Sequence, residues 1–336
     1  MLLSLFSFSL ALAQEAPPIV NGTTTSDYKP VGMFYGCADS NCNDFWSCSG
    51  TIVSPRWVVT AAHCVEGMDL SAEIYFIVGP SWENATDWSV VSNYWAHEQY
   101  DDETLVHDIA VLELSTGISS SAATPMPINT DFVNNSWVGN ELQMVGYGIT
   151  YTDGEDSSIK RTADMFIDEV YQEVILLEDY SGQQNVCSGD SGGAALGYTN
   201  GSWELVGVNS FTVGDCESFE AGIVPVDRYI SWLQGKGVPI NEEPEPSSEP
   251  SSEPSSEPSI EPSSEPAGEP AAETDSDTEW SSPFGDMDEY DEDDPAGGVK
   301  PMCSTGGVAE TAVLFFGLLG VSIRRKREGL SHREQH

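Results

Sequence analysis

The chain has 336 residues, of which 39% are hydrophobic and 10% aromatic, so it can bury the core of a sizeable domain and still carry further segments. Its 55 Asp and Glu residues against 12 Lys and Arg give a formal net charge of −43. Such a field repels nucleic acid and anionic lipid, which argues against both as ligands and favours basic substrates. Adaptation to a salty medium, where ions screen self-repulsion, explains the same composition and stays open.

Residues 1–13 are predicted to be a signal peptide. Leu2–Leu12 is an apolar run, and Ala11-Leu12-Ala13 has the small-x-small pattern of a cleavage site. A buried strand or helix is the competing interpretation, but a polar, Pro-containing sequence follows directly. Residues 14–18 are then a short pro-segment, and the remainder of the chain is expected to be exported.

Residues 19–240 are predicted to form one all-β domain, itself acidic, with 31 Asp and Glu against 6 Lys and Arg. Short β-rich runs alternate with Gly, Pro, Asn and Asp turns, which is typical of a barrel or a sandwich. A short helix at about Val226–Gln234 closes the domain, because Tyr229, Ile230 and Leu233 are spaced to face a core. Expected strands include Trp57–Thr60, Ile74–Val78, Ile109–Leu114, Leu142–Gly146 and Leu205–Ser210.

Residues 241–300 are predicted to be a solvated acidic stalk. Over 241–273 a Glu-Pro-Ser-Ser repeat prevents helix and central strand, and its like charges extend the chain. Residues 274–300 continue as an acidic tract with few apolar groups and are expected to be disordered. Loose calcium binding to this tract is the alternative, but no ligand spacing supports it.

Residues 301–336 combine three features in order: Cys303 among small residues, the apolar run Ala312–Ile323, and the basic cluster Arg324–Arg327. Counted from Gly306, a helix of about 18 residues spans about 27 Å, barely a bilayer core. The basic cluster should stay cytoplasmic, which leaves everything before it outside. A transmembrane helix is therefore predicted here, and a buried globular helix is disfavoured because no domain surrounds the run.

Three short segments carry the residues of one kind of chemistry. A serine hydroxyl is a poor nucleophile unless a base lies within hydrogen-bonding reach and a third group fixes the tautomer of that base. His63 can be the base and Asp108 can accept its other ring proton. Glycines around Ser191 let backbone N–H groups point at one place, as an oxyanion hole requires. The segments are Thr60-Ala61-Ala62-His63-Cys64, His107-Asp108-Ile109-Ala110-Val111-Leu112 and Gly189-Asp190-Ser191-Gly192-Gly193.

In this His–Asp–Ser order, the segments resemble the signature blocks of the chymotrypsin/trypsin family of serine proteases, over about residues 19–235. The resemblance implies two six-stranded antiparallel Greek-key barrels with the active site between them and a short C-terminal helix. It implies a serine endopeptidase that hydrolyses protein or peptide substrates through an acyl-enzyme, without a cofactor or a metal, and with an oxyanion hole formed by Gly189 and Ser191.

The resemblance also implies an activation pair. Ile19-Val20-Asn21-Gly22 resembles the mature N-terminus of the family, whose freed amino group pairs with the aspartate before the nucleophile, here Asp190. An activating protease would have to cut after Pro18, where family zymogens commonly carry Arg or Lys. The alternative is that Ile19 is never freed and the domain stays inactive.

Six of the seven cysteines lie within residues 37–216, which suggests three disulfides, an oxidising compartment and a separate role for Cys303. The resemblance implies the pairs Cys48–Cys64 and Cys187–Cys216, which leaves Cys37 and Cys42 for the third. It also implies that Ser210 hydrogen-bonds the catalytic Asp108 and that four residues form the substrate pocket: Asn185 at its floor, Ser210, Thr212 and Gly222. Asn185 carries no charge, so a small or medium uncharged residue is expected before the scissile bond.

The tail is similar to sorting signals of the myxobacterial type, which implies processing near Cys303 by sorting machinery and attachment to, or release from, the cell surface. A permanent membrane anchor is the plainer alternative. Two other functions stay open: a surface-displayed binding module on a protease scaffold that is not activated, and a processing protease specific for one partner protein. His97 and His107 are expected to be structural or surface residues, since strand neighbours such as His107 and Asp108 point to opposite faces.

Overall fold

The structure is a computed structural model that describes residues 19–154, 156–199 and 201–241. The predicted signal peptide, pro-segment, stalk and sorting tail, including Cys303, lie outside the described residues. The boundaries proposed for these segments therefore stay predictions.

The first half of the described chain forms a closed antiparallel barrel with the strand order β2-β3-β4-β7-β6-β5. Its strands are rich in β-branched and aromatic residues, which pack well on a pleated surface. Every residue of β2 is buried, and the strand is paired on both edges, with β3 and β5. The strands are β2 Val31–Cys37, β3 Phe45–Ser54, β4 Trp57–Thr60, β5 Tyr75–Val78, β6 Asp87–Ala96 and β7 Ala110–Leu114.

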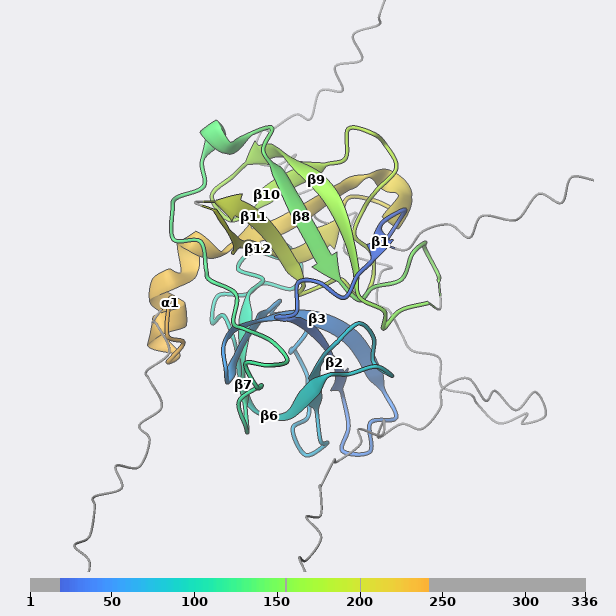
Figure 1. The fold of residues 1–336 in the computed structure, drawn as a ribbon, viewed down its shortest axis with the longest axis vertical. Coiled ribbons are helices and arrows are strands. Elements are labelled where there is room, and N and C mark those ends of the chain that lie inside the picture. Colours follow the sequence, from blue (N-terminus) through green and yellow to red (C-terminus); the bar gives the residue numbers. More distant parts are fainter. Residues whose placement is uncertain (1–18, 155, 200, 242–336) are drawn as a thin grey trace, which may run out of the picture.

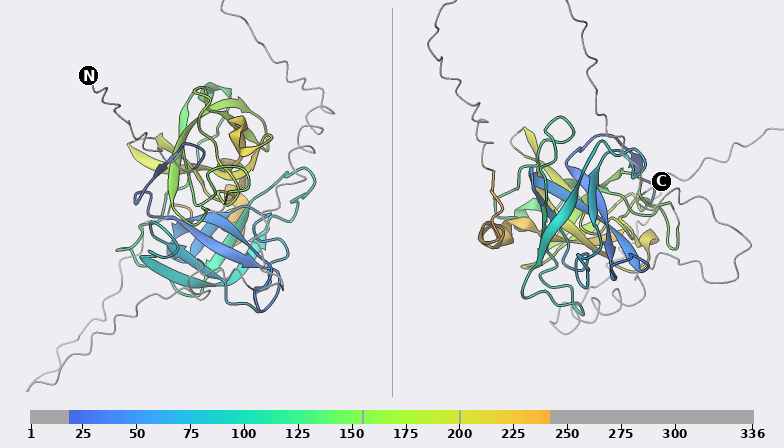
Figure 2. Two further views of the ribbon diagram at one scale, coloured as in Figure 1. Left: turned by 90° about the vertical axis from the view of Figure 1, so that its right-hand side faces the viewer. Right: turned by 90° about the horizontal axis from the view of Figure 1, so that it is seen from below.

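The second half forms another six-stranded antiparallel barrel, in the order β9-β10-β13-β12-β11-β8 and closed by pairing of β8 with β9. The short strand β1 (Thr23–Thr24) pairs antiparallel with the first two residues of β9. The two barrels are stacked, with the first (blue to teal) below the second (green to yellow) in Figure 1 and in the left view of Figure 2. The strands are β8 Glu141–Gly146, β9 Arg161–Val170, β10 Ile175–Glu178, β11 Ala194–Thr199, β12 Ser202–Thr212 and β13 Glu220–Pro225.

In the part of the chain that the structure describes, helical structure is limited to short segments. Two 3₁₀ turns, Asn135–Trp137 and Cys216–Ser218, lie in loops, and a third (Val226–Tyr229) leads into α1 (Ile230–Gly235). The predicted terminal helix is therefore confirmed, with its first turn in 3₁₀ form. Leu233 is fully buried in the core of the first barrel. The predicted double-barrel fold with one short C-terminal helix is also confirmed.

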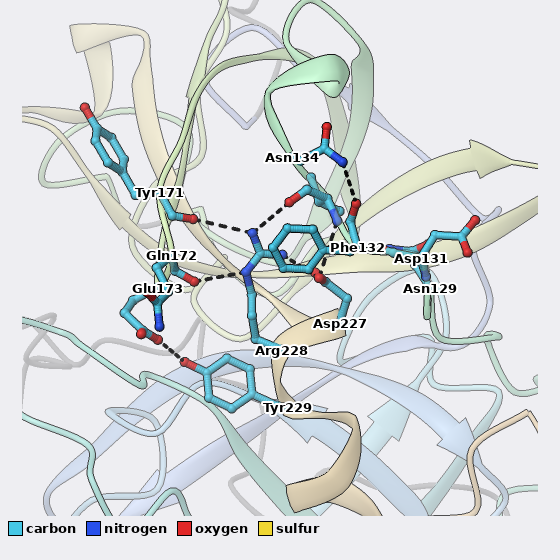
Figure 3. Close-up of polar contacts among 11 residues, drawn as sticks. Asn129, Asp131, Phe132, Asn134, Tyr171, Gln172, Glu173, Asp227, Arg228 and Tyr229 are labelled. Atoms are coloured by element: carbon cyan, nitrogen blue, oxygen red, sulfur yellow. Dashed lines mark hydrogen bonds and ion pairs between the residues drawn. The ribbon is translucent and has the colours of Figure 1, made fainter.

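The segment that crosses from the first barrel to the second, residues 115–140, is held near its end by Arg228. As Figure 3 shows, the guanidinium donates to the carbonyl oxygens of Val133 and Gln172, forms an ion pair with the buried Asp227, and lies over the exposed ring of Phe132 at 4.4 Å from its centroid. The 3₁₀ turn before α1 is thus bound to the crossing segment.

Candidate active site

His63 and Asp108 leave the first barrel side by side. Strand β4 ends at Thr60, which lies opposite Ala110, the first residue of β7, so the residues just beyond these ends are neighbours. Nδ1 of His63 lies 2.8 Å from Oδ2 of Asp108, and the His63 backbone N–H donates to Oδ1 at 2.9 Å. The aspartate side chain is fully buried, whereas 28% of the histidine side chain is exposed. Within the described residues, the other ring nitrogen, Nε2, has only a weak contact with Cys64 Sγ at 3.8 Å.

Opposing effects set the pKa of His63. Burial lowers it, because desolvation disfavours the imidazolium, but the charge and hydrogen bond of Asp108 raise it, with a smaller contribution from Glu66. The net result is a pKa above the ordinary histidine value. Asp108 is held in turn by Ser210 of β12, whose Oγ donates to Oδ2 at 2.5 Å. A proton accepted by this imidazole is therefore stabilised by a fixed, buried carboxylate.

Ser191 lies in a tight turn directly before β11. The turn requires glycine on both sides, since φ is +92° at Gly189 and +78° at Gly192, a left-handed conformation that other residues rarely adopt. A Cβ at Gly192 would lie 2.1 Å from Oγ1 of Thr60, three residues before the histidine. The turn is thus pressed against the end of β4 in the first barrel.

The N–H groups of Gly189 and Ser191 make no hydrogen bond to any described residue, so both remain able to donate to a bound oxygen. The Ser191 carbonyl accepts the Ser49 N–H at 2.8 Å, and Oγ of Ser49 donates to the Gly189 carbonyl at 2.8 Å. Among the described residues, no hydrogen bond joins the Ser191 hydroxyl to His63. Such bonds are often long without substrate and tighten in the complex.

Asp190 is fully buried beneath this turn. Its Oδ1 accepts the Gly148 N–H at 2.8 Å and its Oδ2 accepts the Cys187 N–H at 2.9 Å. A Cβ at Gly146 would lie 2.2 Å from Oδ1, so no larger residue fits beside the carboxylate. Burial raises the pKa of Asp190 to about 6, against the lowering effect of the two N–H donors and of Arg161. The carboxylate lacks a directly bonded cation within the described residues.

The N-terminal segment lies beside the loops that surround Asp190. Ile19 and Val20 are 0% and 5% exposed, and Val20 forms an isolated antiparallel bridge with Asn185. Val20 also packs with the disulfide-bonded Cys187 and Cys216. The segment proposed to supply the activating amino group is therefore seated next to the turn it would support.

Asn185, the predicted pocket floor, is fully buried and its amide is satisfied internally. Its Nδ2 donates to the Glu220 carbonyl at 3.3 Å, and its Oδ1 accepts the Val186 N–H at 3.0 Å. The side chain therefore offers a substrate no charge, and one of its amide N–H groups and one acceptor position of its oxygen are already used.

The two residues predicted to form the pocket walls, Thr212 and Gly222, do not lie opposite each other. Thr212 ends β12 and donates from Oγ1 to the Gly214 carbonyl at 3.2 Å. Its partner across the sheet is Ala221, whereas Gly222 lies opposite Phe211, and a Cβ at Gly222 would meet the Phe211 ring at 2.2 Å. Gly222 is thus covered by Phe211, and the residue facing Thr212 is Ala221. A β-bulge between Asn209 and Phe211 sets this register, which a sequence comparison does not reveal.

Three disulfides join the pairs implied by the sequence. Cα–Cα distances are 4.9 Å for Cys37–Cys42, 6.1 Å for Cys48–Cys64 and 5.1 Å for Cys187–Cys216. The second lies beside His63 and the third beside Asp190, so both brace the site. Cys48, His63 and Cys64 are also the one group of potential metal ligands among the described residues, but the two sulfurs are bonded to each other and provide no thiolate.

His107 does not lie on a strand, so the reason given for its role was wrong. It occupies a turn before β7 with φ of +58°. Its ring stacks on His97 at 4.7 Å, and its Nδ1 is 2.9 Å from the Tyr229 hydroxyl. Tyr229 in turn donates to Glu173, as Figure 3 shows. Both histidines therefore have structural partners away from His63.

Two further residues of the site were not predicted. Ser49 of β3 contacts the turn that carries Ser191, and Arg161, at the start of β9, donates to the carbonyl oxygen of Gly148 at 2.8 Å. Neither stands in a motif, because a serine in a strand and an arginine at a strand end are common. The only available signal was that basic residues are rare in this domain.

The fold and this arrangement define a double-barrel protein of the serine-hydrolase kind. The trypsin family model matches residues 20–233, more than half of the chain, and the chain belongs to the trypsin family. A trypsin from Simulium vittatum is 30% identical over 247 residues, which cover 66% of this chain and 96% of that protein. Brachyurin from Leptuca pugilator is 28% identical over 208 residues, or 57% of this chain and 88% of that protein.

A solved structure described as HL collagenase has the same fold, with a TM-score of 0.57 and 20% sequence identity over 66% of this chain and all of that one. The trypsin relatives indicate that the chain is a serine peptidase, and the family implies protein substrates. Within residues 19–154, 156–199 and 201–241, no helix is long and apolar enough to cross a membrane. The predicted transmembrane run, Ala312–Ile323, lies outside those ranges.

Proposed function

We propose that the domain is an endopeptidase in which Ser191 is the nucleophile, His63 the general base and Asp108 the group that orients the base. In the first step, His63 Nε2 takes the proton of the Ser191 hydroxyl as its oxygen attacks the scissile carbonyl carbon. The resulting oxyanion accepts hydrogen bonds from the N–H groups of Gly189 and Ser191. His63 then gives the proton to the leaving amine, and water hydrolyses the acyl-enzyme by the same steps.

One observation carries this proposal: a buried carboxylate bonded to Nδ1 of His63 at 2.8 Å, with a second hydrogen bond from Ser210 at 2.5 Å. These contacts fix the tautomer with its proton on Nδ1, which leaves Nε2 to act as the base. The two unused N–H groups beside Ser191 supply the second element that acyl transfer needs.

The test uses the full chain cut so that it begins at Ile19. A fluorophosphonate probe should label it once, and Ser191→Ala should abolish labelling and lower peptide hydrolysis by several orders of magnitude. Ser202→Ala, at an exposed serine that begins β12, is the matched control and should leave both unchanged. Absence of labelling on the cut wild-type chain would instead favour a binding module on a protease scaffold.

We also propose specificity for uncharged residues before the scissile bond. The buried Asn185 side chain is uncharged, and Val186, which follows it, lies with Ala221 and Ile223 in the apolar core of the second barrel. A basic side chain would there lose its hydration without gaining a partner. Cleavage of a peptide library should show alanine-sized to leucine-sized residues at this place, and a dominant Lys or Arg preference would contradict the assignment.

Activation and location complete the proposal. We place the enzyme outside the cytoplasm, because three disulfides require an oxidising compartment and its trypsin relatives are typically secreted. A cut after Pro18 frees the Ile19 amino group, and its pairing with Asp190 is supported by the burial of Ile19 and by the contacts of Val20 with Asn185 and Cys187. Sorting through Cys303 and the apolar tail stays a prediction, to be checked by mass spectrometry of the C-terminus of the exported protein.

A further inference from the structure

Arg161 is a buried cation that the proposed mechanism does not use. It is the first residue of β9 and is 2% exposed. Its Nη1 donates to the carbonyl oxygens of Gly148 at 2.8 Å and Ile159 at 3.3 Å, and its Nη2 lies 3.4 Å from Oδ2 of Asp156. Nε has no hydrogen-bond partner within the described residues. Asp156 is 39% exposed, so this ion pair only partly compensates the buried charge.

The guanidinium is separated from Asp190 by one residue. Gly148 accepts from Arg161 through its carbonyl and donates from its N–H to Oδ1 of Asp190 at 2.8 Å. Arg161 also lies directly opposite Gly146, and a Cβ on that glycine would lie 2.2 Å from the same oxygen. The buried cation and the buried carboxylate therefore face each other across the Gly146–Gly148 segment. Their attraction lowers the pKa of Asp190 and opposes the effect of its burial.

We infer that Arg161 is a positioning residue that supplies the positive charge for Asp190 before Ile19 is freed, so that the uncut chain already forms the Gly189–Ser191 turn and cleaves peptides. This inference rests on the proposed function, because it assigns a further residue to the same site. Before the cut, Ile19 nitrogen is a neutral amide, and Arg161 is the cation that acts on Asp190. After the cut, the new ammonium contacts the carboxylate directly and makes Arg161 partly redundant.

This redundancy gives a test that a merely structural role would not pass. The full chain is prepared uncut, and also with residues 14–18 replaced by the recognition sequence of a specific protease that cuts directly before Ile19. Arg161→Met removes the charge at similar length, and Arg161→Lys retains it. Arg56→Met, at a half-exposed arginine paired with Glu113 on the first barrel, is the matched control. The readout is the ratio of kcat/KM in the cut form to that in the uncut form.

We expect measurable hydrolysis by the uncut wild-type chain. Arg161→Met should lower kcat/KM at least tenfold in the uncut form and less than about threefold in the cut form, and Arg161→Lys should restore part of the loss. An equal loss in both forms, or an uncut wild-type chain without activity, would overturn the inference. A cut wild-type chain that neither hydrolyses peptides nor reacts with the probe would overturn the proposed function itself.

A second variant tests the same point if Arg161→Met does not fold. Asp156→Asn keeps the oxygen that accepts the Thr150 N–H at 3.0 Å but removes the negative charge that competes for Arg161 and repels Asp190. Uncut activity should therefore rise relative to cut activity. An unchanged or lower ratio of uncut to cut activity would contradict the assignment of Arg161.

Discussion

Replacing Asp190 by Asn in the uncut chain removes a buried carboxyl group whose ionisation opposes folding. Burial raises the pKa of Asp190 to about 6 in the folded protein, whereas an aspartate in an unfolded chain titrates near pH 3.9, about 2 pH units lower. That difference corresponds to about 3 kcal/mol. Because the folded pKa is the higher one, the neutral carboxyl stabilises the fold in full below about pH 4, and this contribution is lost as the pH rises through about 6.

The assay is urea unfolding followed by tryptophan fluorescence between pH 4 and pH 8, with disulfides intact and Ser191→Ala in every chain to prevent self-cleavage. The free energy of unfolding of the chain that retains Asp190, minus that of the Asp190→Asn chain, should fall by about 2.4 kcal/mol across this range, because a small part of the effect lies below pH 4. Asp131→Asn, at an exposed aspartate, is the control and should give a flat difference. The fall should shrink once Ile19 is freed. A flat or rising difference for Asp190→Asn would refute the reasoning.

Three further outcomes follow from the site. Ser210→Ala removes the 2.5 Å hydrogen bond that the Ser210 hydroxyl donates to Oδ2 of the buried Asp108. It should therefore lower kcat/KM about tenfold, measured with a peptide substrate under non-saturating conditions. The pH profile of kcat/KM should fall toward acid with an inflection above about 6.5, because the pKa of His63 is raised and only the neutral imidazole accepts a proton; an inflection below 6 would contradict this. Gly192→Ala places a Cβ 2.1 Å from Thr60 Oγ1 at a φ of +78°, so it should cost more than about 2 kcal/mol in urea unfolding and remove activity.

The candidate site residues that stand in short motifs could be predicted from the sequence, whereas contacts between residues distant in the sequence could not. His63, Asp108 and Ser191 stand in short motifs whose residue types follow from the reaction, so they could be predicted without a structure. The same holds for Gly189 and Gly192, because a tight turn at positive φ favours glycine.

The contacts that were missed depend on strand register and on the packing of one barrel against the other. Arg161 meets Gly148 only because β9 pairs with β8 in the observed register. Gly222 lies under Phe211 rather than opposite Thr212 because a bulge shifts the pairing of β12 with β13. Sequence patterns indicate that a strand exists but do not fix its register, and a one-residue shift exchanges the faces of all its side chains.

This acidic domain has few basic residues, and some of them are buried. Six Lys and Arg residues occur between residues 19 and 240, and two of them, Lys160 and Arg161, are almost fully buried at the start of β9. Lys160 Nζ donates to the carbonyl oxygens of Asp27 and Tyr28, on the segment that leads from Ile19, and burial lowers its pKa to about 7.

Arg161, the next residue along the chain, donates to the carbonyl oxygen of Gly148, and the N–H of Gly148 donates to Asp190. Surface charges are screened by salt, whereas buried ones are screened much less. The repulsion among the surface acids therefore varies with the salt concentration, whereas the attraction between the buried Arg161 and the buried Asp190 varies much less. If Arg161 positions the Asp190 turn as proposed, its effect on that turn should therefore change little with salt concentration.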